Sequence, residues 1–348
     1  MAQKIGFSTA TQTTNSQTSH VTLSPLDEKL RRNFYEKALR ESGNTAKTPT
    51  AFDLPPPSNP LQLQVDSAKN QGKRKEMEDA HFHCKIPEGF MMGIFDGHGE
   101  NGVIATRAAK TYELSFPTLL RTHPEDKKKI FKTINTSFHE SLSETTGGTT
   151  ALFCFFDSLT HRLYTSNLGD SKALVFRKTT EGLIDSFPVS IERNWANPKD
   201  MERARIAFND PEFFKIWSQA KNPKERRFPF PFYGVNVSRS LGDKGMTIND
   251  KTATSQNAHQ TFVQLKEGDL LVMGCDGVWD FVTPEGLIDN VLTANWDHPF
   301  LAQRIVNYAL KTSSDNITVI CARTKATLSA SSSLESTQSF EDSESSTD

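Results

Sequence analysis

The sequence has few cysteines, and they are widely spaced. The four are Cys84, Cys154, Cys275 and Cys321 in a chain of 348 residues. Disulfide frameworks and cysteine-based zinc sites need cysteines in close pairs or at short, regular spacings. Three of the four stand in apolar, strand-like runs, so we interpret all of them as buried thiols in a reducing compartment such as the cytoplasm. This pattern excludes a disulfide scaffold.

The sequence also lacks a long apolar run. No stretch approaches the roughly 20 apolar residues that cross a bilayer. The first residues carry no apolar stretch of the kind that marks a secretory signal peptide. We therefore expect no membrane span. The polar start, rich in Ser and Thr and free of acids, is compatible with export as an effector and equally with simple disorder.

A strong charge imbalance and a histidine cluster are absent as well. The formal net charge is −2, which gives no support for nucleic-acid binding or for a basic membrane patch. The nine histidines are scattered, which argues against a zinc or iron centre. We expect a chain that binds neither nucleic acid nor membrane.

Composition divides the chain into three parts. Residues 1–60 are polar and Pro-rich, and a Ser-Pro pair predicts the start of a single helix over 25–42. Residues 61–325 alternate short apolar runs with amphipathic segments, as expected of one folded domain. Residues 326–348 hold nine serines and five acidic residues, which predicts a disordered acidic tail.

Within residues 61–325 the apolar runs have strand length and occur in groups, with helical patterns between the groups. This order favours an α+β fold, in which antiparallel sheets pack against helix pairs, over a doubly wound α/β fold. The predicted strands are 89–95, 150–156, 162–166, 172–177, 269–274 and 316–322. The predicted helices are 103–120, 124–142, 284–292 and 299–310.

One apolar run, 90–95, ends at Asp96-Gly97-His98-Gly99. A buried strand that places a carboxylate at its end, followed by glycines that let the backbone come close, suits a hard metal ion. A common Asp-Gly turn explains the same residues. The choice between them depends on acids at other strand ends.

Five more acidic residues border predicted strands. Asp276 ends one, Asp315 precedes one and Asp170 follows one, while Glu78 and Asp79 come just before a further probable strand. Together they suit Mg²⁺ or Mn²⁺, because hard cations bind oxygen ligands. Two such ions close together are a standard device for hydrolysing phosphate esters. Arg74 is then a candidate for binding the phosphoryl oxygens in a bidentate manner.

These residues belong to seven segments that together resemble the metal-dependent Ser/Thr protein phosphatases of the 2C type. Each segment alone is weak evidence, but the ordered set is specific, and the Met-Glu-Asp-Ala form resembles the eukaryotic-like branch. The segments are RKEMEDA (74–80), FDGHG (95–99), GGTTA (147–151), NLGDSK (167–172), VSRSLGD (237–243), CDGVWD (275–280) and DNIT (315–318).

The resemblance implies a fold and a metal site. The fold is a β-sandwich of two antiparallel sheets flanked by helix pairs, with the metals at one end, and residues 61–325 become the catalytic domain. Two Mg²⁺ or Mn²⁺ ions are implied, with a weaker third. The ligands carried over are the bridging Asp96, then Glu78 and the Gly97 carbonyl for one metal, Asp276 and Asp315 for the other, and Asp170 and Asp280 with Asp276 for the third.

The resemblance also implies the reaction. Hydroxide bound to the metals attacks a phosphoserine or phosphothreonine of a protein substrate, and no phospho-enzyme forms. Arg74 binds the phosphate, and His98 donates a proton to the leaving oxygen, a contribution of roughly 10²–10⁴-fold. We expect the chain to act as a monomer. Two departures from the family pattern are Glu100, where a Gly is usual, and residues 195–232, which we interpret as an exposed, flap-like segment or a packed loop.

Two other functions fit the sequence. One is a phosphatase-like scaffold that binds partner proteins with little or no catalysis. Such a scaffold would be expected to lose metal ligands or the phosphate-binding Arg74, and here all are present. The other is hydrolysis of a small phosphate ester at the same metal site.

Overall fold

The structure is a computed structural model. The predicted helix over 25–42, the tail from residue 327 and Glu100 lie outside the part that it describes. It describes residues 61–99, 102–143, 147–209, 215, 236–248 and 251–326.

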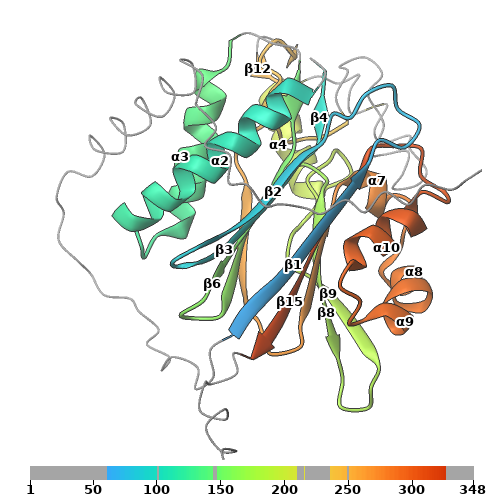
Figure 1. Ribbon diagram of the computed structural model, residues 1–348. Helices are drawn as coiled ribbons and strands as arrows, with labels where there is room; N and C mark the ends of the chain where they lie inside the picture. Colours follow the sequence, from blue (N-terminus) through green and yellow to red (C-terminus); the bar gives the residue numbers. More distant parts are fainter. Residues whose placement is uncertain are drawn as a thin grey trace, which may run out of the picture. The chain divides into compact units, whose positions relative to one another are not determined.

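Two five-stranded antiparallel sheets form the centre of the domain (Figure 1). One has the strand order β1-β15-β14-β8-β9 and the other β13-β7-β6-β3-β2. Their strands are β1 Leu61–Asn70, β2 Ala80–Ile86, β3 Gly89–Phe95, β6 Ala151–Asp157, β7 Arg162–Leu168, β8 Lys172–Lys178, β9 Ile184–Pro188, β13 His259–Gln264, β14 Leu270–Gly274 and β15 Ile317–Ala326.

Each sheet buries one face against the other. In β6 the side chains of Leu152, Cys154 and Phe156 enter the core between the sheets. From the facing sheet, β14 contributes Leu271 and Met273 to the same core. Alternate residues of a strand point to opposite faces, so these strands have a second apolar set that needs cover on the outside.

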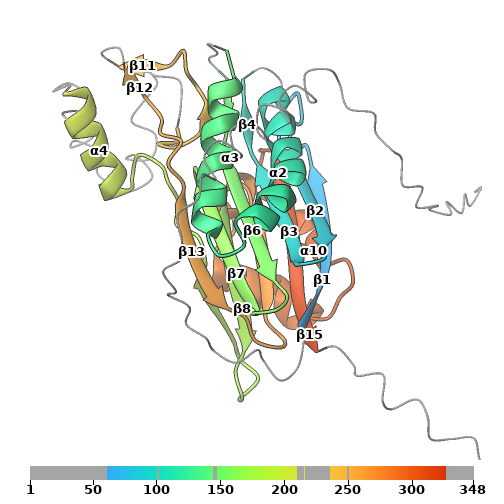
Figure 2. The ribbon, with the colours of Figure 1, turned by 90° about the vertical axis from the view of Figure 1, so that its left-hand side faces the viewer.

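Helices α2 (Val103–Thr122) and α3 (Lys127–Ser141) cover the outer face of the sheet that contains β6 (Figure 2). Aromatic side chains fill this layer. Phe153 is on the outer face of β6. The centroid of its ring lies 4.8 Å from the ring centroid of Phe116 and 5.6 Å from that of Phe131. The rings are tilted relative to one another, the arrangement that aromatic pairs prefer.

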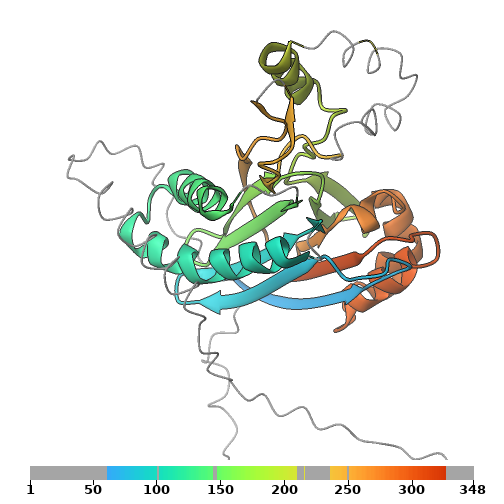
Figure 3. The ribbon, with the colours of Figure 1, turned by 90° about the horizontal axis from the view of Figure 1, so that it is seen from above.

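A second group of helices covers the outer face of the other sheet (Figure 3). It contains α7 (Asp276–Trp279), α8 (Pro284–Leu287), a π-helical turn (Ile288–Leu292), α9 (Thr293–Asn295) and α10 (Leu301–Ala309). Its buried residues pack on the outward side chains of β14 and β15. The order helix, sheet, sheet, helix confirms the predicted α+β sandwich.

The predicted elements agree with the structure, with a few differences. The predicted helix 284–292 is a short α-helix followed by a π-helical turn. Strands β1, β9 and β13 were not predicted, because their half-buried patterns carry no long apolar run. Cys154, Cys275 and Cys321 are buried thiols as predicted, whereas Cys84 is only half-buried.

The segment 195–232 is described only in part. Up to Asn209 it packs through one face, where Trp195, Asp200 and Ala204 are buried, while Ile206 on the other face is 68% exposed. Helix α4 (Pro198–Phe208) begins at Asn197, whose side chain accepts a hydrogen bond from the Lys199 amide. Residues 210–214 and 216–235 lie outside the described residues.

Replacing Phe153 with Ala should destabilise the domain by about 3–5 kcal/mol, because the ring is fully buried among other aromatic side chains. Urea unfolding of the two proteins measures the difference in free energy. Phe262→Ala is the control, since that ring is 60% exposed, and it should change stability much less. Equal losses in the two variants would contradict the packing described here.

Candidate active site

The acids at the strand ends meet at one end of the sandwich. Antiparallel pairing of β2 with β3 places Ala80 opposite Phe95, which brings Asp79 and Asp96 together. In the other sheet, β14 pairs with β15 so that Gly274 faces Val319. Asp276, just after the end of β14, therefore lies close to Asp315, just before the start of β15.

A cavity of about 180 Å³ lies at this end. Eight of the nine predicted site residues line it, and Asp280 does not. Asp280 lies one turn after Asp276 in α7, where its amide donates to the Asp276 carbonyl at 2.9 Å. The walls contain Arg74, Glu78, Asp96, Gly97, His98, Asp170, Asp276 and Asp315, together with Thr150, Asn236, Val237 and Asn316.

The carboxyl group of Asp96 is in an environment that strongly disfavours its charged form. Burial raises the pKa of its carboxyl group well above the usual range, and the nearby carboxylates of Asp276, Asp79 and Asp170 raise it further. Several carboxylates close together repel one another unless a cation lies among them. The donor set of the cavity, carboxylates and a backbone carbonyl with no thiolate, therefore fits a hard divalent cation.

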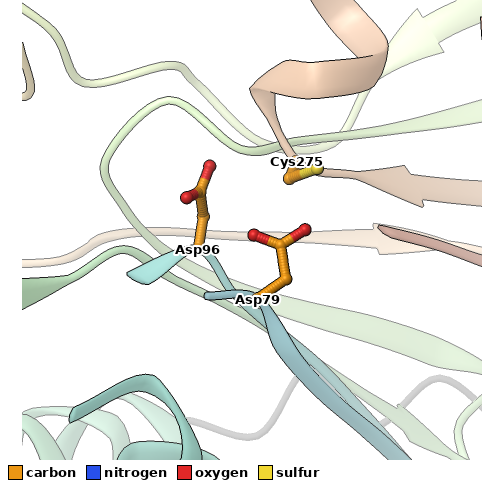
Figure 4. A group of neighbouring side chains, drawn as sticks. All are labelled: Asp79, Asp96 and Cys275. Carbon is orange, nitrogen blue, oxygen red and sulfur yellow. The ribbon is translucent and has the colours of Figure 1, made fainter. Parts of the chain in front are cut away.

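Asp79 also belongs to the site, although it was predicted only as one of the acids beside strands and was given no individual role. A carboxylate oxygen of Asp79, one of Asp96 and the Cys275 sulfur lie within 4.8 Å of one another (Figure 4). The hydroxyl of Thr318 donates to Asp79 Oδ2 at 2.7 Å, while Asp79 Oδ1 is buried with no hydrogen-bond partner among the described residues. Burial raises the pKa of Asp79 to about 6. The sequence feature that pointed to Asp79 was its position directly before a strand.

Cys275, the third member of this group, is a neutral thiol. Burial raises the pKa of the thiol well above its usual value, and the adjacent carboxylates of Asp79 and Asp96 act in the same direction. The thiol donates a hydrogen bond to the Asn316 carbonyl at 3.3 Å. A protonated thiol is a poor ligand, so the group offers oxygen atoms to a cation.

Asn316 holds the loop that carries Arg74 and Glu78. Its side-chain oxygen accepts the Glu78 amide at 2.8 Å, and its side-chain nitrogen donates to the carbonyls of Gln71 and Glu76, both at 2.9 Å. One amide side chain therefore fixes three points of an irregular loop. This role of Asn316 could not be predicted, because nothing in the local sequence pattern links residue 316 to residues 71–78.

Two glycines permit the close backbone contacts at the site. A Cβ on Gly97 would lie 2.5 Å from the carbonyl oxygen of Glu78, and one on Gly277 would lie 1.9 Å from that of Asn316. Real Cβ atoms do not approach oxygen so closely, so both positions require glycine. These contacts bring the loops that bear Glu78 and Asp315 against those that bear Asp96 and Asp276.

Arg74 lies at the rim of the cavity. Its side chain is 55% exposed, and its Nη2 donates to Asp315 Oδ2 at 2.7 Å. An exposed guanidinium can exchange such a partner for another anion at little cost, because water screens the pair.

His98 has a carboxylate partner that the sequence analysis did not identify. Its Nε2 lies 2.9 Å from both carboxylate oxygens of Asp243, which is completely buried. Burial alone would lower the pKa of His98, but the facing carboxylate of Asp243 raises it above its usual value. Asp243 was visible in the sequence only as the last residue of the segment VSRSLGD.

A buried ion cluster supports the segment that leads to Asp243. Asp200, in α4, is fully buried, and its Oδ1 lies 2.6 Å from Arg239 Nη2. The other oxygen, Oδ2, lies 3.5 Å from Arg193 Nη1. Residues 193 and 200 thereby anchor the described part of the flap-like segment to residues 236–243.

Comparisons with known proteins point to one family. The family model for protein phosphatase 2C matches residues 63–317. Probable protein phosphatase 2C 45 of Oryza sativa subsp. japonica is 28% identical over 271 residues, which cover 74% of this chain and 86% of that protein. The serine-threonine phosphatase 2C of Toxoplasma gondii has a TM-score of 0.58 at 18% identity, covering 78% of this chain and 98% of that one.

A further solved structure shares the fold. The catalytic domain of the serine threonine protein phosphatase PstP, solved in complex with two manganese ions, has a TM-score of 0.50 at 17% identity. It covers 76% of this chain and 99% of that one.

The four-layer sandwich, which here has an acid-lined cavity at one end, is the fold of the serine-threonine phosphatase 2C of Toxoplasma gondii. The chain belongs to the protein phosphatase 2C family, whose model matches most of its length. The match to residues 63–317 lies within the predicted domain of 61–325, whose outer boundaries stay predictions.

Replacing Gly148 with Ala should lower kcat by about tenfold or more. A Cβ there would lie 2.5–2.7 Å from the carboxylate of Asp243 and would displace it from His98. Steady-state turnover of a phosphothreonine peptide measures the effect. The control is Gly286→Ala, where the nearest atom is 3.2 Å from the new Cβ, and its kcat should not change. Unchanged kcat in a folded Gly148→Ala protein would contradict the proposed link between Asp243 and His98.

Proposed function

We propose that this chain hydrolyses phosphoserine and phosphothreonine in proteins with two Mg²⁺ or Mn²⁺ ions as cofactors. The observation that carries the proposal is the convergence of Glu78, Asp96, Asp276 and Asp315 on one cavity that also contains Arg74. The family match and the manganese ions of the related PstP structure support it.

The residues divide into two sets of ligands. Asp96, whose pKa is raised by burial and by the carboxylates of Asp276, Asp79 and Asp170, would be shared between the ions. Glu78 and the Gly97 carbonyl would complete one site, and Asp276 and Asp315 the other. When bound, such ions lower the pKa of water toward about 7 and offset the charge of the phosphoryl group.

A third, weaker ion would be held by Asp170, Asp276 and Asp280. Asp170 and Asp276 line the cavity, which supports this assignment. Asp280 does not line it and is the ligand with the least structural support. Its place one helical turn after Asp276 would let both side chains face one ion.

Arg74 would bind the phosphate of the substrate. Its guanidinium donates to Asp315 at the cavity rim and is more than half exposed, so a phosphoryl group can reach it. The planar fork of an Arg side chain matches two phosphoryl oxygens at once. The same contact would orient the phosphorus atom toward the acidic wall.

His98 would donate the proton to the leaving oxygen of serine or threonine. An alkoxide is a poor leaving group, so the proton matters most for protein substrates. Asp243 raises the pKa of the imidazole and fixes the orientation of its ring. The pair would therefore keep a charged proton donor at the cavity.

Two alternatives have less support. A non-catalytic scaffold has no need of the acid cluster, whose repulsion costs stability unless a cation binds. A phosphatase of small esters would share the cavity, so only the comparison of phosphopeptides with small phosphate monoesters separates it from the proposed function.

The setting is also part of the proposal. All four cysteines are free thiols, which supports a reducing compartment. Among the described residues, no helix combines the length and the apolar character needed to cross a membrane. The substrate would be a phosphorylated protein, and the enzyme would act as a monomer.

Purified full-length protein should release phosphate from a phosphothreonine peptide in the presence of Mn²⁺ or Mg²⁺. The release should stop when EDTA is added. Malachite-green detection of phosphate measures the release. Excess metal added after EDTA should restore the rate. Release that continues in EDTA would contradict the metal-dependent mechanism.

Replacing Asp96 or Asp276 with Asn should reduce turnover by at least about 10³-fold while the protein stays folded. Asp96→Asn also removes buried negative charge, so the melting temperature in EDTA should not fall. Circular dichroism and phosphate release measure the two effects. Asp185→Asn, at an exposed carboxylate of β9, is the control and should keep full activity. An active Asp96→Asn protein would rule out the assigned ligands.

Replacing His98 with Asn should slow hydrolysis of a phosphothreonine peptide by roughly 10²–10⁴-fold. Hydrolysis of p-nitrophenyl phosphate should slow much less, because p-nitrophenolate leaves without a proton. The ratio of the two kcat values is the measurement. Equal losses on both substrates would show that His98 does not act as the proton donor.

A further inference from the structure

A second cavity lies away from the acidic site, between α3 and the segment that leads into β13. Its volume is about 420 Å³. One wall comes from the first half of α3, and the other from residues 256–260, where the Gln260 side chain reaches the Lys128 carbonyl at 3.4 Å. We call it the lysine groove. Its walls contain Asp126, Lys128, Lys129, Lys132, Asn135, Gln256, Asn257, Ala258 and Gln260.

The lysine groove carries uncompensated positive charge. Lys128 and Lys132 are exposed and Lys129 is half-buried. Within the described ranges, none of these three ammonium groups forms an ion pair. The single acid in the wall, Asp126, caps its own helix by accepting the Lys129 amide at 2.9 Å. The groove therefore attracts anions.

A buried side chain in the wall independently indicates a ligand that accepts a hydrogen bond. Asn135 is 1% exposed, and its oxygen accepts a hydrogen bond from the Tyr112 hydroxyl. Its amide nitrogen is buried and has no acceptor among the residues that the structure describes. A buried donor without a partner costs about 1–3 kcal/mol. A carboxylate in the groove would supply the missing acceptor.

The chain itself contains a segment of matching charge. After Lys325 it has five acidic residues and no Lys or Arg. The described chain ends at Ala326, which pairs with Leu61, and the Leu61 amide donates to His161 Nε2 at 3.0 Å. His161 precedes β7, whose first residue faces Gln264 of β13. The groove residue Gln260 lies four residues earlier on that strand.

We propose that the acidic C-terminal segment, residues 327–348, binds in the lysine groove through its carboxylates. Twenty-two residues can span up to about 70 Å when extended, which is ample for this path. Covalent attachment gives the segment an effective concentration in the millimolar range, so modest electrostatic contacts suffice. The binding does not depend on the catalytic function proposed above.

The test uses the full-length chain and a fluorescein-labelled synthetic peptide of residues 335–348, followed by fluorescence anisotropy at low ionic strength. One variant neutralises the attached segment. Its substitutions are Glu335→Gln, Glu341→Gln, Asp342→Asn, Glu344→Gln and Asp348→Asn. The peptide should bind this variant at least about tenfold more tightly than it binds the unaltered chain, because the attached segment no longer competes.

A second pair of variants locates the binding surface. In the neutralised background, Lys129→Gln with Lys132→Gln should weaken peptide binding at least about tenfold. Lys85→Gln with Lys311→Gln removes the same charge from β2 and from the end of α10 and should change binding less than twofold. Asn135→Asp keeps the acceptor for Tyr112 but removes the donor, and it should also weaken binding if its melting curve shows that it is folded.

Two results would overturn the proposal. Equal peptide affinity for the unaltered and the neutralised chains would show that the attached segment does not occupy the groove. An equal effect of the groove pair and the control pair of lysine substitutions would show that the peptide senses only net charge. Lys85, Lys132 and Lys311 are exposed and Lys129 is half-buried, so melting curves of the two pairs of variants confirm that each is folded.

Discussion

The repulsion among buried carboxylates around Asp96 is the constraint on which this structure depends. Burial and three neighbouring acids raise the pKa of Asp96, and such a cluster exists only if the rest of the fold holds it together. The two sheets do so, because each delivers acids from strand ends that cannot separate without breaking strand pairing. The packing of the sheets and helices supplies the folding free energy that offsets the repulsion among these carboxylates.

Around that cluster, uncharged groups keep the geometry. Asn316 bonds to three backbone positions of the loop that carries Arg74, and Gly97 and Gly277 allow backbones to approach. On the opposite side, Asp243 orients His98, and the Asp200 cluster supports the segment before it. The supporting residues come from distant parts of the sequence, so the cavity is a product of the tertiary fold.

The sequence predicted much of the fold, because long apolar runs such as 151–157 and 270–274 are buried on both faces and leave a clear signal. Strands β1 and β13 are half-buried, and their weaker patterns were not recognised. The same division holds at the site. Acids beside strands were visible, whereas the partner of His98, at position 243, is 145 residues away, and no local pattern connects the two.

The pairing of β1 with β15 has a consequence for how the chain is assembled. Among the described residues, Leu61–Asn70 pairs with one strand, Ile317–Ala326, about 250 residues later. During synthesis β1 cannot pair until β15 has been made. Contacts between residues so distant in sequence slow folding. Asp315 directly precedes that last strand, so the polypeptide completes this sheet and its set of strand-end acids in the same late step.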